Sequence, residues 1–351
     1  MPNWEESLLP IHATTREAVA VLNTGGLEIA VVVDDDRMLK GTITDGDVRR
    51  SLLRGCNMDT PVREIMNADP LVAAVGTDGD ALLKLMNGPK LRQIPLLDAA
   101  RRVSDIAHIR NLTPPVETRD NWVVLMAGGL GERLRPLTAA TPKPLLSVGD
   151  RPLLQRIVES FIKENFRKFY MSVNYKAETI KDLFNDGAEW NATIRYLEEE
   201  RKLGTAGALQ LIPERANEPV IVMNGDLITK VSFQDILDYH IQQEASATMC
   251  VREYDLQVPF GVVDLDGNRI RAIDEKPVHR FFVNAGIYVV NPEVIDLIPK
   301  DQPLDMTELF DMLIARGMNV TAFPIHEYWL DIGRIDDLKR ANLDFDNGTV
   351  S

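Results

Sequence analysis

Short hydrophobic runs alternate with longer amphipathic segments over most of the chain from residue 122 onward. A run of four to eight hydrophobic residues is typical of a buried strand, whereas hydrophobic residues that recur every three or four positions indicate a helix with one buried face. We predict strands at residues 122–126, 168–173, 192–197, 220–223, 247–251 and 286–290, and helices at residues 152–164, 178–184, 233–243 and 307–316. This alternation favours an α/β fold built on one sheet.

The first third of the chain contains a diverged internal repeat. The first copy has two strand-like runs and a helix-like segment, at residues 29–33, 39–43 and 45–53. The same order recurs about 60 residues later, at residues 94–97, 103–106 and 108–112, and residues 61–66 open this second copy. Strands and helices in this order predict a separate α+β module made of two related halves.

A proline-rich segment, TPPVETRD at residues 113–120, joins the two parts. Adjacent prolines interrupt helices and stiffen the backbone, which suits a linker. We therefore predict two domains, residues 1–115 and 120–351, as the length of 351 residues also suggests.

Composition narrows the classes of function. Hydrophobic residues make up 45 % and charged residues 26 % of the chain, as in ordinary globular proteins. A formal net charge of −14 argues against nucleic acid as a partner, because an acidic chain cannot replace the counterions of DNA or RNA. Cys56 and Cys250 are far apart, the first residues lack the basic region of a signal peptide, and no apolar run approaches the roughly 20 residues that span a bilayer. We expect a soluble, cytoplasmic protein without a membrane partner.

The segment with the clearest chemistry is LMAGGLGERLRPLT at residues 125–138, followed by PKPLL at residues 142–146. A predicted strand runs into three glycines within four positions, where the main chain can approach a phosphate closely and turn its N–H groups toward it. Arg133 can bind two phosphate oxygens at once, and Lys143 adds a point charge. The GxGxxG dinucleotide motif fits poorly because Leu134 takes the place of its third glycine, and the GxxxxGK[ST] P-loop motif is absent.

This segment resembles the signature of the sugar-phosphate nucleotidyltransferases, GGxGxRLxPLT followed by PKPLL, and fills every position of it. The resemblance extends from about residue 122 to about residue 343. It implies a Rossmann-like mixed-sheet domain that makes a nucleotide sugar from a nucleoside triphosphate and a sugar-1-phosphate, with release of pyrophosphate. It also implies that the nucleotide lies on the glycine loop, at Leu125, Ala127, Gly128, Gly129, Gly131 and Arg133.

Two aspartates are candidate ligands of Mg²⁺. Asp226 ends the run VIVMNGD at residues 220–226, and ligands of α/β sheets lie at the carboxyl ends of strands. Asp331 lies in WLDIG at residues 329–333, which resembles the W-x-D-x-G segment of the same family, and the resemblance implies that both carboxylates bind Mg²⁺. Sequence spacing does not show that they meet. Asp226 alone could lie in a plain turn, and Asp331 could cap a helix that begins near Arg334.

Three further segments resemble the sugar-binding motifs of this family: FGVV at residues 260–263, EKP at residues 275–277 and NAGIY at residues 284–288. The resemblance implies that Lys276 meets the sugar phosphate and Glu275 the sugar hydroxyls. Gly261 and Asn284 would line the same pocket. Each segment could instead belong to a hairpin, since residues 266–268, DGN, form a ready turn between strands.

The segment EERKLGTAGAL at residues 199–209 resembles the E-x-x-x-LGTAGAL motif, which faces the nucleobase and the sugar. Glu199 and the backbone near Ala127 are our candidates for reading the base. Gly204 and Thr205 would open a helix whose N-terminus favours an anion. A small-residue helix packed on the sheet explains the same residues without a ligand. The five histidines are scattered, and none is a good catalytic candidate.

In the first part, GTITDGD at residues 41–47 resembles a CBS-domain motif. The resemblance implies that Gly41, Thr44 and Asp47 hold the ribose and phosphate of an adenine or guanine nucleotide. The second copy departs from it, with Ala107 and Arg110 in place of Thr and Asp. Thr44 and Asp47 could equally cap the following helix, which would leave a CBS pair that serves dimerisation without a ligand. Because paired CBS domains commonly associate, we expect a homo-oligomer.

Together the motifs predict a sugar-1-phosphate nucleotidyltransferase preceded by a regulatory CBS pair. Its resemblance to CBS-fused guanylyltransferases favours GTP with glucosamine-1-phosphate or mannose-1-phosphate, giving GDP-glucosamine or GDP-mannose, while UTP, CTP and dTTP stay open. Catalysis would depend on positioning and charge neutralisation by Arg133, Lys143, Asp226, Lys276 and Asp331. A non-catalytic sensor of nucleotides or nucleotide sugars is the alternative, disfavoured because the charged residues of the motifs are all present.

Overall fold

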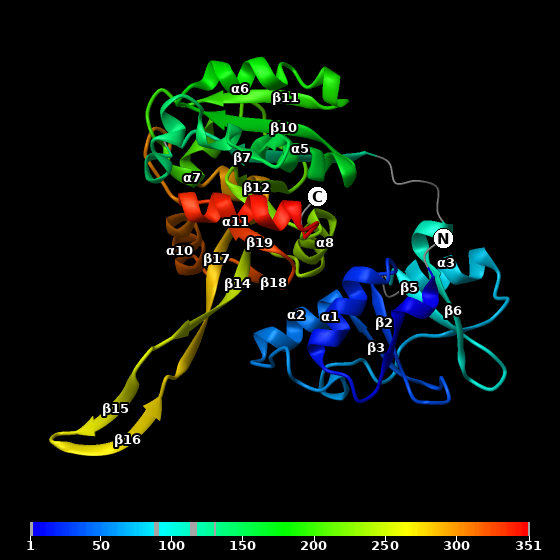
Figure 1. Ribbon diagram of the computed structural model, residues 1–351. Helices are drawn as coiled ribbons and strands as arrows, with labels where there is room; N and C mark the ends of the chain where they lie inside the picture. The colour runs from blue at the N-terminus through cyan, green and yellow to red at the C-terminus, as the bar shows by residue number, and fades with distance from the viewer. Residues whose placement is uncertain (1–2, 88–90, 113–117, 130, 350–351) are drawn as a thin grey trace. The chain divides into compact units, whose positions relative to one another are not determined.

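The computed structural model describes residues 3–87, 91–112, 118–129 and 131–349 (Figure 1). The chain forms two compact units, residues 1–117 and 118–351. Most of the predicted linker, residues 113–117, lies outside the described residues. None of the described helices is both long and apolar enough to cross a membrane.

The N-terminal unit contains the predicted repeat as two three-stranded sheets of the same design. In each sheet the first two strands are parallel and the third is antiparallel to the second. The first copy consists of β1 (Leu8–Pro10), α1 (Thr15–Thr24), β2 (Ile29–Val33), β3 (Leu39–Thr44) and α2 (Asp45–Leu53). The second consists of β4 (Ala73–Ala74), α3 (Gly79–Asn87), β5 (Gln93–Leu97), β6 (Val103–His108) and α4 (Ile109–Leu112). The helices α1 and α3 and the short strand β4 were not predicted.

The assignment of residues 61–66 to the second copy is wrong. These residues form a short 3-10 helix, η2 (Val62–Glu64), and the buried side chains of Val62 and Ile65 pack in the hydrophobic core of the first copy. The Thr42 N–H also donates a 3.0 Å hydrogen bond to the Asn67 carbonyl. The segment therefore completes the first copy, because its two apolar side chains find their burial there.

The C-terminal unit is built on a seven-stranded sheet with the order β11–β10–β7–β12–β17–β14–β18. Strand β17 is antiparallel to both of its neighbours and the other adjacent pairs are parallel, so the predicted mixed sheet is confirmed. The strands are β7 (Arg119–Met126), β10 (Phe166–Val173), β11 (Thr193–Glu198), β12 (Val220–Asn224), β14 (Ala247–Gln257), β17 (Val278–Val290) and β18 (Val320–Ile325).

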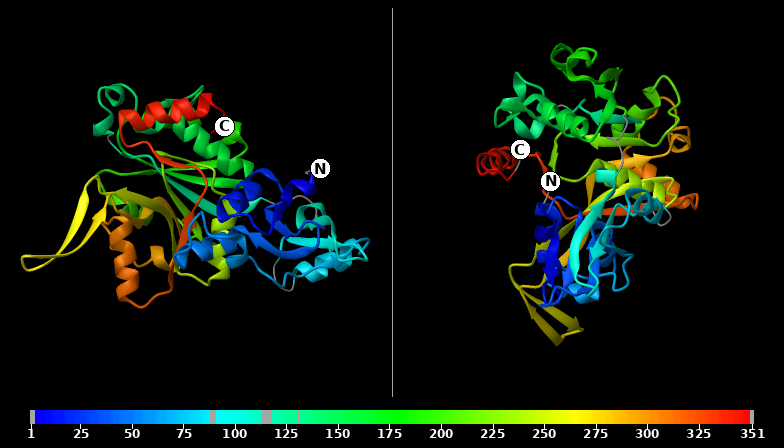
Figure 2. Two further views of the ribbon diagram at one scale, coloured as in Figure 1. Left: turned by 60° about the horizontal axis from the view of Figure 1, so that its bottom comes forward. Right: turned by 90° about the vertical axis from the view of Figure 1, so that its right-hand side faces the viewer.

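Helices cover both faces of this sheet (Figures 1 and 2). Along β12, Ile221 and Met223 enter one hydrophobic core while Val220 and Val222 enter the other. Successive side chains of a strand point to opposite faces, which explains why this central strand is hydrophobic throughout. The helices are α5 (Leu153–Lys163), α6 (Ala177–Phe184), α7 (Gly204–Gly207), α8 (Phe233–Gln242), α9 (Pro292–Ile295), α10 (Met306–Ala315) and α11 (Ile335–Asp346).

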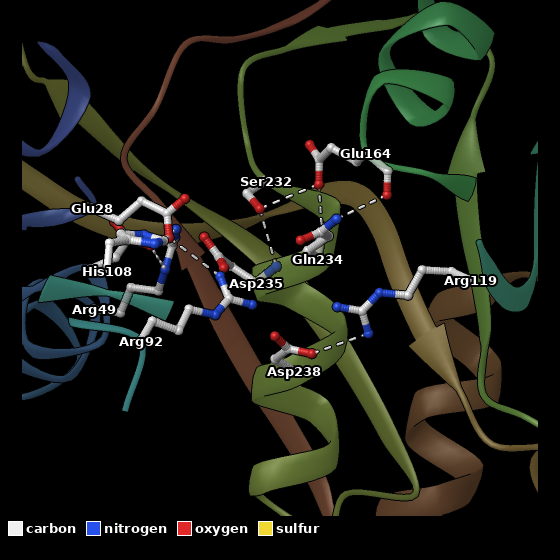
Figure 3. A network of polar contacts seen from close by, with 11 residues as sticks. Glu28, Arg49, Arg92, His108, Arg119, Glu164, Ser232, Gln234, Asp235 and Asp238 are labelled. Carbon is white, nitrogen blue, oxygen red and sulfur yellow. Dashed lines mark hydrogen bonds and ion pairs between the residues drawn. The ribbon is translucent and has the colours of Figure 1, made fainter. Parts of the chain in front are cut away.

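A buried polar network fixes the start of α8 against the end of α5 (Figure 3). The Glu164 carboxylate accepts hydrogen bonds from the Gln234 N–H at 2.8 Å and the Ser232 hydroxyl at 3.3 Å. Ser232 in turn caps α8 by accepting from the Asp235 N–H at 3.2 Å. Burial raises the pKa of Glu164, and these hydrogen bonds oppose that shift. The network complements the stacking of Phe161 on Phe233, whose ring centroids lie 3.6 Å apart.

Strands β14 and β17 extend beyond the sheet as a two-stranded ribbon. Their pairing continues to Gln257↔Val278, and after a break the hairpin of β15 (Gly261–Asp266) and β16 (Arg269–Glu275) prolongs it. We call residues 253–282 the arm, and both figures show it projecting from the sheet. The sequence predicted only the portions of β14 and β17 that lie within the sheet.

Two further short pairs complete the fold. Strand β13 (Leu227–Thr229) pairs with β19 (Trp329–Asp331), and β8 (Ser147–Val148) pairs with β9 (Arg151–Pro152). The helix that follows β19, α11, begins at Ile335, and the Arg334 N–H donates a 2.7 Å hydrogen bond to Oδ2 of Asp337 in its first turn. A start near Arg334 was predicted, but Asp331 does not form the cap.

Candidate active site

The carboxyl ends of β7 and β12 lie side by side and bring two predicted motifs together. Asn224 pairs with Met126, and the Gly225 N–H donates a 2.9 Å hydrogen bond to the Met126 carbonyl. A Cβ atom at Gly225 would lie 2.7 Å from that carbonyl oxygen, so only glycine fits this crossing. The glycine loop that follows β7 and the aspartate that follows β12 therefore emerge at the same edge of the sheet.

Asp226 and Asp331, which are remote in sequence, meet through the β13–β19 ladder. Leu227 is the register partner of Asp331, and the Ile332 N–H donates a 3.0 Å hydrogen bond to the Asp226 carbonyl. Asp331 remains open to solvent on one side. Even so, partial burial and then the negative charge of Asp226 raise the pKa of Asp331, while Lys143 and Arg133 oppose the shift. These four charged groups thus act on one another in a single site.

Lys143 is the cation at the centre of this cluster. Its ammonium group donates a hydrogen bond to Oδ2 of Asp226 and forms an ion pair with it. The other carboxylate oxygen, Oδ1 of Asp226, is buried without a hydrogen-bond partner among the described residues, as is Oδ1 of Asn224. Buried oxygens rarely lack partners, and two carboxylates beside an unsatisfied oxygen fit the preference of hard divalent cations for oxygen ligands.

The glycine loop is held in a compact form that places Lys143. Gly131 has φ +61°, and a Cβ there would lie 2.8 Å from Cγ2 of Thr138 and 3.0 Å from Cβ of Lys143. The Thr138 hydroxyl donates a 2.8 Å hydrogen bond to the Gly131 carbonyl. Arg133, in the 3-10 helix η3 (Glu132–Leu134), extends toward the other side of the site, with its guanidinium nitrogens 3.7 Å from the place of a Cβ on Gly333.

Sequence reasoning missed a lysine that clamps this loop. Lys176 Nζ donates hydrogen bonds to the carbonyls of Ala139 at 2.7 Å and Ala140 at 2.5 Å. These carbonyls lie shortly before Lys143, so the clamp helps to fix the segment that carries it. Nothing in the sequence around Lys176 marks this role, because its partners come from a distant loop.

Glu199 lies beside the glycine loop, with Oε1 at 3.2 Å from the place of a Cβ on Gly128. Its carboxylate accepts hydrogen bonds from the Ser172 hydroxyl and from the Leu203 N–H, the latter at 3.0 Å. These bonds orient the side chain, and a carboxylate with about four acceptor positions can take further donors. Its reading of a nucleobase stays a prediction.

The N-terminus of α7, where an anion was expected, receives a carboxylate of the chain itself. The Thr205 N–H donates to Oδ1 of Asp305 at 3.0 Å, and the Thr205 hydroxyl lies 3.3 Å from the same oxygen. A Cβ at Gly204, whose φ is +78°, would lie 2.5 Å from the Leu304 carbonyl oxygen. Gly204 and Thr205 therefore brace the base-side loop against residues 304 and 305, and the binding of a nucleotide by these two residues stays a prediction.

The predicted sugar pocket is not assembled as a whole. Asn284 lies at the base of the arm, where its side chain donates to the Tyr288 hydroxyl at 2.7 Å and accepts from the Gly286 N–H at 2.9 Å. Gly261 and Glu275 are register partners on the arm itself, and both are exposed. Lys276 follows them at the break in pairing with φ +52°. Strand β17 alone separates Val278 from Asn284 by roughly 20 Å, and Lys276 lies beyond Val278, so the arm would have to bend for these groups to meet.

The predicted regulatory residues form a helix cap in the N-terminal unit. The Thr44 N–H and hydroxyl donate to Oδ2 of Asp47 at 2.8 and 2.7 Å, and Arg50 donates to Oδ1 at 2.6 Å. Thr44 and Asp47 therefore cap helix α2, which is one of the two interpretations that the sequence left open. Nucleotide binding at Thr44 and Asp47 stays a prediction.

The geometry of the C-terminal unit agrees with a family comparison, in which the model described as nucleotidyl transferase matches residues 122–348. This chain belongs to the nucleotidyl transferase family. A CBS-domain model matches residues 8–54, which span the first copy of the N-terminal repeat.

Curated and solved relatives point to the same family. The mannose-1-phosphate guanyltransferase of Debaryomyces hansenii is 34 % identical over 223 residues, covering 61 % of this chain and 61 % of that protein. The match thus spans less than two thirds of the relative. A provisionally assigned glucose-1-phosphate thymidylyltransferase from Bacillus anthracis, in complex with a sucrose, is 25 % identical with TM-score 0.52, covering 63 % of this chain and 93 % of that chain. HddC from Yersinia pseudotuberculosis, complexed with GMP-PN, is 25 % identical with TM-score 0.50, covering 64 % and 99 %.

Proposed function

We propose that this nucleotidyl transferase family member makes a nucleotide sugar from a nucleoside triphosphate and a sugar-1-phosphate and releases pyrophosphate. The observation that carries the proposal is the convergence of Arg133, Lys143, Asp226 and Asp331 beside a glycine loop at the carboxyl ends of β7 and β12. A cluster of two cations and two carboxylates beside a glycine loop suits a triphosphate and a divalent cation.

The reaction requires one in-line displacement. An oxygen of the sugar phosphate forms a bond to the α-phosphorus, the bond from that phosphorus to the oxygen bridging the β-phosphorus breaks, and pyrophosphate departs with the electron pair. Such chemistry depends on positioning and on neutralising charge. Arg133 and Lys143 would hold the departing phosphates, and Lys276 the attacking one.

Asp226 and Asp331 would hold the cation, for which we propose Mg²⁺. When bound, Mg²⁺ would withdraw charge from the phosphate oxygens. The free Oδ1 of Asp226 supports this role, because an unpartnered buried carboxylate oxygen is otherwise costly.

For the substrates we propose GTP with mannose-1-phosphate or glucosamine-1-phosphate. The curated relative from Debaryomyces hansenii is named as a mannose-1-phosphate guanyltransferase, and HddC was solved in complex with GMP-PN. The likeness to a thymidylyltransferase keeps dTTP, and with it UTP and CTP, as the alternative.

The test is pyrophosphate release from GTP, UTP, CTP, ATP and dTTP, each paired with a panel of sugar-1-phosphates, with Mg²⁺ and with EDTA. We expect metal-dependent release with one pair, and Asp226→Asn as the matched control should abolish it under the same conditions. Tight nucleotide binding without release from any pair would support the sensor alternative instead.

We further propose that the N-terminal unit regulates the enzyme by binding an adenine or guanine nucleotide, in a homo-oligomer. The CBS match over residues 8–54 supports this role. Addition of AMP, ATP or GTP should change turnover of the full chain and leave a shortened chain that begins at Arg119 unaffected. Equal responses of both chains would contradict the proposal. We also propose that the protein is cytoplasmic, as its sequence predicted.

A further inference from the structure

Asn224 is the last residue of β12 and lies at the centre of the sheet edge that carries the candidate site. Its register partner on β7 is Met126, from which the glycine loop continues, and Asp226 follows it by two positions. On its other side β12 pairs with β17, which carries Asn284. The asparagine therefore lies between the strand that leads to the proposed nucleotide site and the strand that leads to the proposed sugar site.

The side-chain amide of Asn224 leaves its hydrogen-bonding capacity unused. Its Oδ1 is buried and has no hydrogen-bond partner among the described residues. Its Nδ2 also lacks a partner among them but reaches the surface. A buried amide oxygen without a partner lowers stability, and an apolar side chain of similar shape would avoid that penalty. A ligand that forms hydrogen bonds to the amide would explain why a polar side chain occupies this position.

The surroundings of Asn224 position its amide although no hydrogen bond holds it. A Cβ atom at Gly286, whose φ is +72°, would lie 2.7 Å from Nδ2 of Asn224, so the amide packs directly against the backbone of β17. That backbone bulges, because residues 285–287 lie opposite a single residue of β14. The Trp329 indole N–H donates a 2.8 Å hydrogen bond to the Ala285 carbonyl and so fixes the bulge.

Asn224 and Asn284 face the same side of the sheet. Alternation along β12 places Asn224 on the side where Val222 enters the core. Tyr288 belongs to that core, and Asn284 donates a hydrogen bond to its hydroxyl. Gly286 contacts both amides, because its N–H donates to Oδ1 of Asn284 at 2.9 Å and its missing side chain makes room for Asn224. The two amides are therefore neighbours on one face.

We infer that Asn224 binds hydroxyl groups of the sugar-1-phosphate and helps to select the sugar, an inference that rests on the proposed function. Two neighbouring hydroxyls can satisfy both ends of the amide, because one accepts from Nδ2 while the other donates to Oδ1 once rotation about χ2 turns it outward. A phosphate, which only accepts, would leave Oδ1 without a partner, and a cation would leave Nδ2 without one. The neighbouring Asn284, expected to line the sugar pocket, favours the sugar over the ribose of the nucleotide.

Asn224→Leu in the full-length chain tests the inference, because it removes both polar atoms and keeps a similar shape. We expect the KM for the sugar phosphate to rise about tenfold and the KM for the nucleotide to stay unchanged, as for the loss of a hydrogen bond to a hydroxyl. The free energy of unfolding, measured by chemical denaturation, should stay the same or rise, because the variant removes an unsatisfied buried oxygen. Asn217→Leu, at an exposed position in the loop before the same strand, is the matched control and should change neither quantity.

Sugar phosphates that each lack one hydroxyl group identify the contact. The wild-type chain should lose about tenfold in kcat/KM when the hydroxyl that Asn224 binds is removed from the sugar, because the amide is then left unpaired. Asn224→Leu should use that deoxy sugar and its parent equally well. A loss of discrimination confined to one hydroxyl is the result that a direct contact predicts, since the two changes remove the same interaction.

Several results would overturn the inference, and each differs from a failure of the proposed function. Wild-type kinetics in Asn224→Leu would show that no substrate uses the amide. A rise confined to the KM for the nucleotide would assign Asn224 to the ribose, and a defect that excess Mg²⁺ repairs would assign it to the cation. A loss of stability together with the kinetic defect would indicate a structural role. If the wild-type chain turns over no pair of substrates, the proposed function itself is refuted, and this inference with it.

Discussion

The edge of the sheet and the arm share one proposed reaction but are built in opposite ways. At the sheet edge, Lys143 and Asp226 are largely buried, paired with each other and fixed by loops that hydrogen bonds hold in place. On the arm, Glu275 and Lys276 are exposed and supported by a two-stranded ladder. In the proposed reaction, charge stabilisation would thus depend on a part of the unit that many contacts hold in place, and recognition of the sugar on a part that few contacts restrain.

The largest expected effect lies at the sheet edge. Asp226→Asn should lower kcat by about 100-fold or more, the scale for loss of one preorganised electrostatic contact, because it removes both the partner of Lys143 and a ligand of the cation. Pyrophosphate release at saturating substrates measures it. Asp266→Asn, which removes an exposed carboxylate at the tip of the arm, should turn over like wild type. Near-wild-type turnover of Asp226→Asn would refute the assignment of the site.

A substitution on the arm should separate recognition from chemistry. Lys276→Ala is expected to raise the KM for the sugar phosphate by about 10-fold or more, as for loss of a charge-assisted hydrogen bond, and to leave the KM for the nucleotide unchanged. Arg271→Ala, which removes an exposed cation of the same arm, is the matched control. If both KM values rise equally in Lys276→Ala, the arm does not bind the sugar phosphate separately from the nucleotide at the sheet edge.

Two glycines with left-handed backbone offer a direct comparison of the regions. Gly131→Ala should lower kcat/KM by about tenfold, because the added methyl group meets Thr138 and Lys143 in addition to the backbone strain of a positive φ. Gly267→Ala, at the tip of the arm, has φ +57° but nothing within 4 Å of the new Cβ. It should carry the backbone strain alone and keep full activity. Steady-state kinetics of the two variants side by side decide the point.

The smallest expected effect concerns the brace on the base side. Thr205→Ala removes the hydroxyl that accepts from the Met306 N–H at 2.8 Å and lies against Asp305. We expect a loss of about 1 kcal/mol in the free energy of unfolding, as for the loss of a helix cap, measured by chemical denaturation. Ser232→Ala, which removes the cap of α8, should cost a similar amount. A change in nucleotide KM without any loss of stability would instead assign Thr205 to the ligand.

The sequence predicted elements well where hydrophobic periodicity was strong. Helix α5 was predicted at residues 152–164 and spans Leu153–Lys163, because its apolar side chains all face one core. The hairpin at the tip of the arm was left open by the sequence, because residues 266–268 form a ready turn. The extension of β14 and β17 beyond the sheet was missed, because there the strands alternate charged and apolar residues without the continuous run that marked β12. Residues 61–66 were assigned to the wrong repeat because periodicity shows that a side chain is buried and not which core receives it.

The candidate site was predictable to the extent that it is local. The glycine loop and Asp226 follow predicted strands directly, and Lys143 lies in the PKPLL segment after the glycine loop, so their motifs could be read in order. The meeting of Asp226 with Asp331 depends on a ladder between distant segments. Lys176 and Asp305 act on loops far away in sequence, and neither has a local signal. The motifs at residues 260–263 and 275–277 did not show that these residues lie on a ribbon that extends away from the edge of the sheet.

Lys143 and Asp226 form an ion pair, so each side chain occupies the position that a ligand of the other would take. A phosphate that attracts the ammonium group releases the carboxylate, and a cation that occupies the carboxylate releases the ammonium group. Binding of either ligand therefore makes binding of the other more favourable. Thermodynamic linkage requires that each ligand raises the affinity for the other by the same factor. In the structure the lysine thus acts as an internal counterion of Asp226, and in the proposed reaction the nucleotide and the metal would displace it as cooperating ligands.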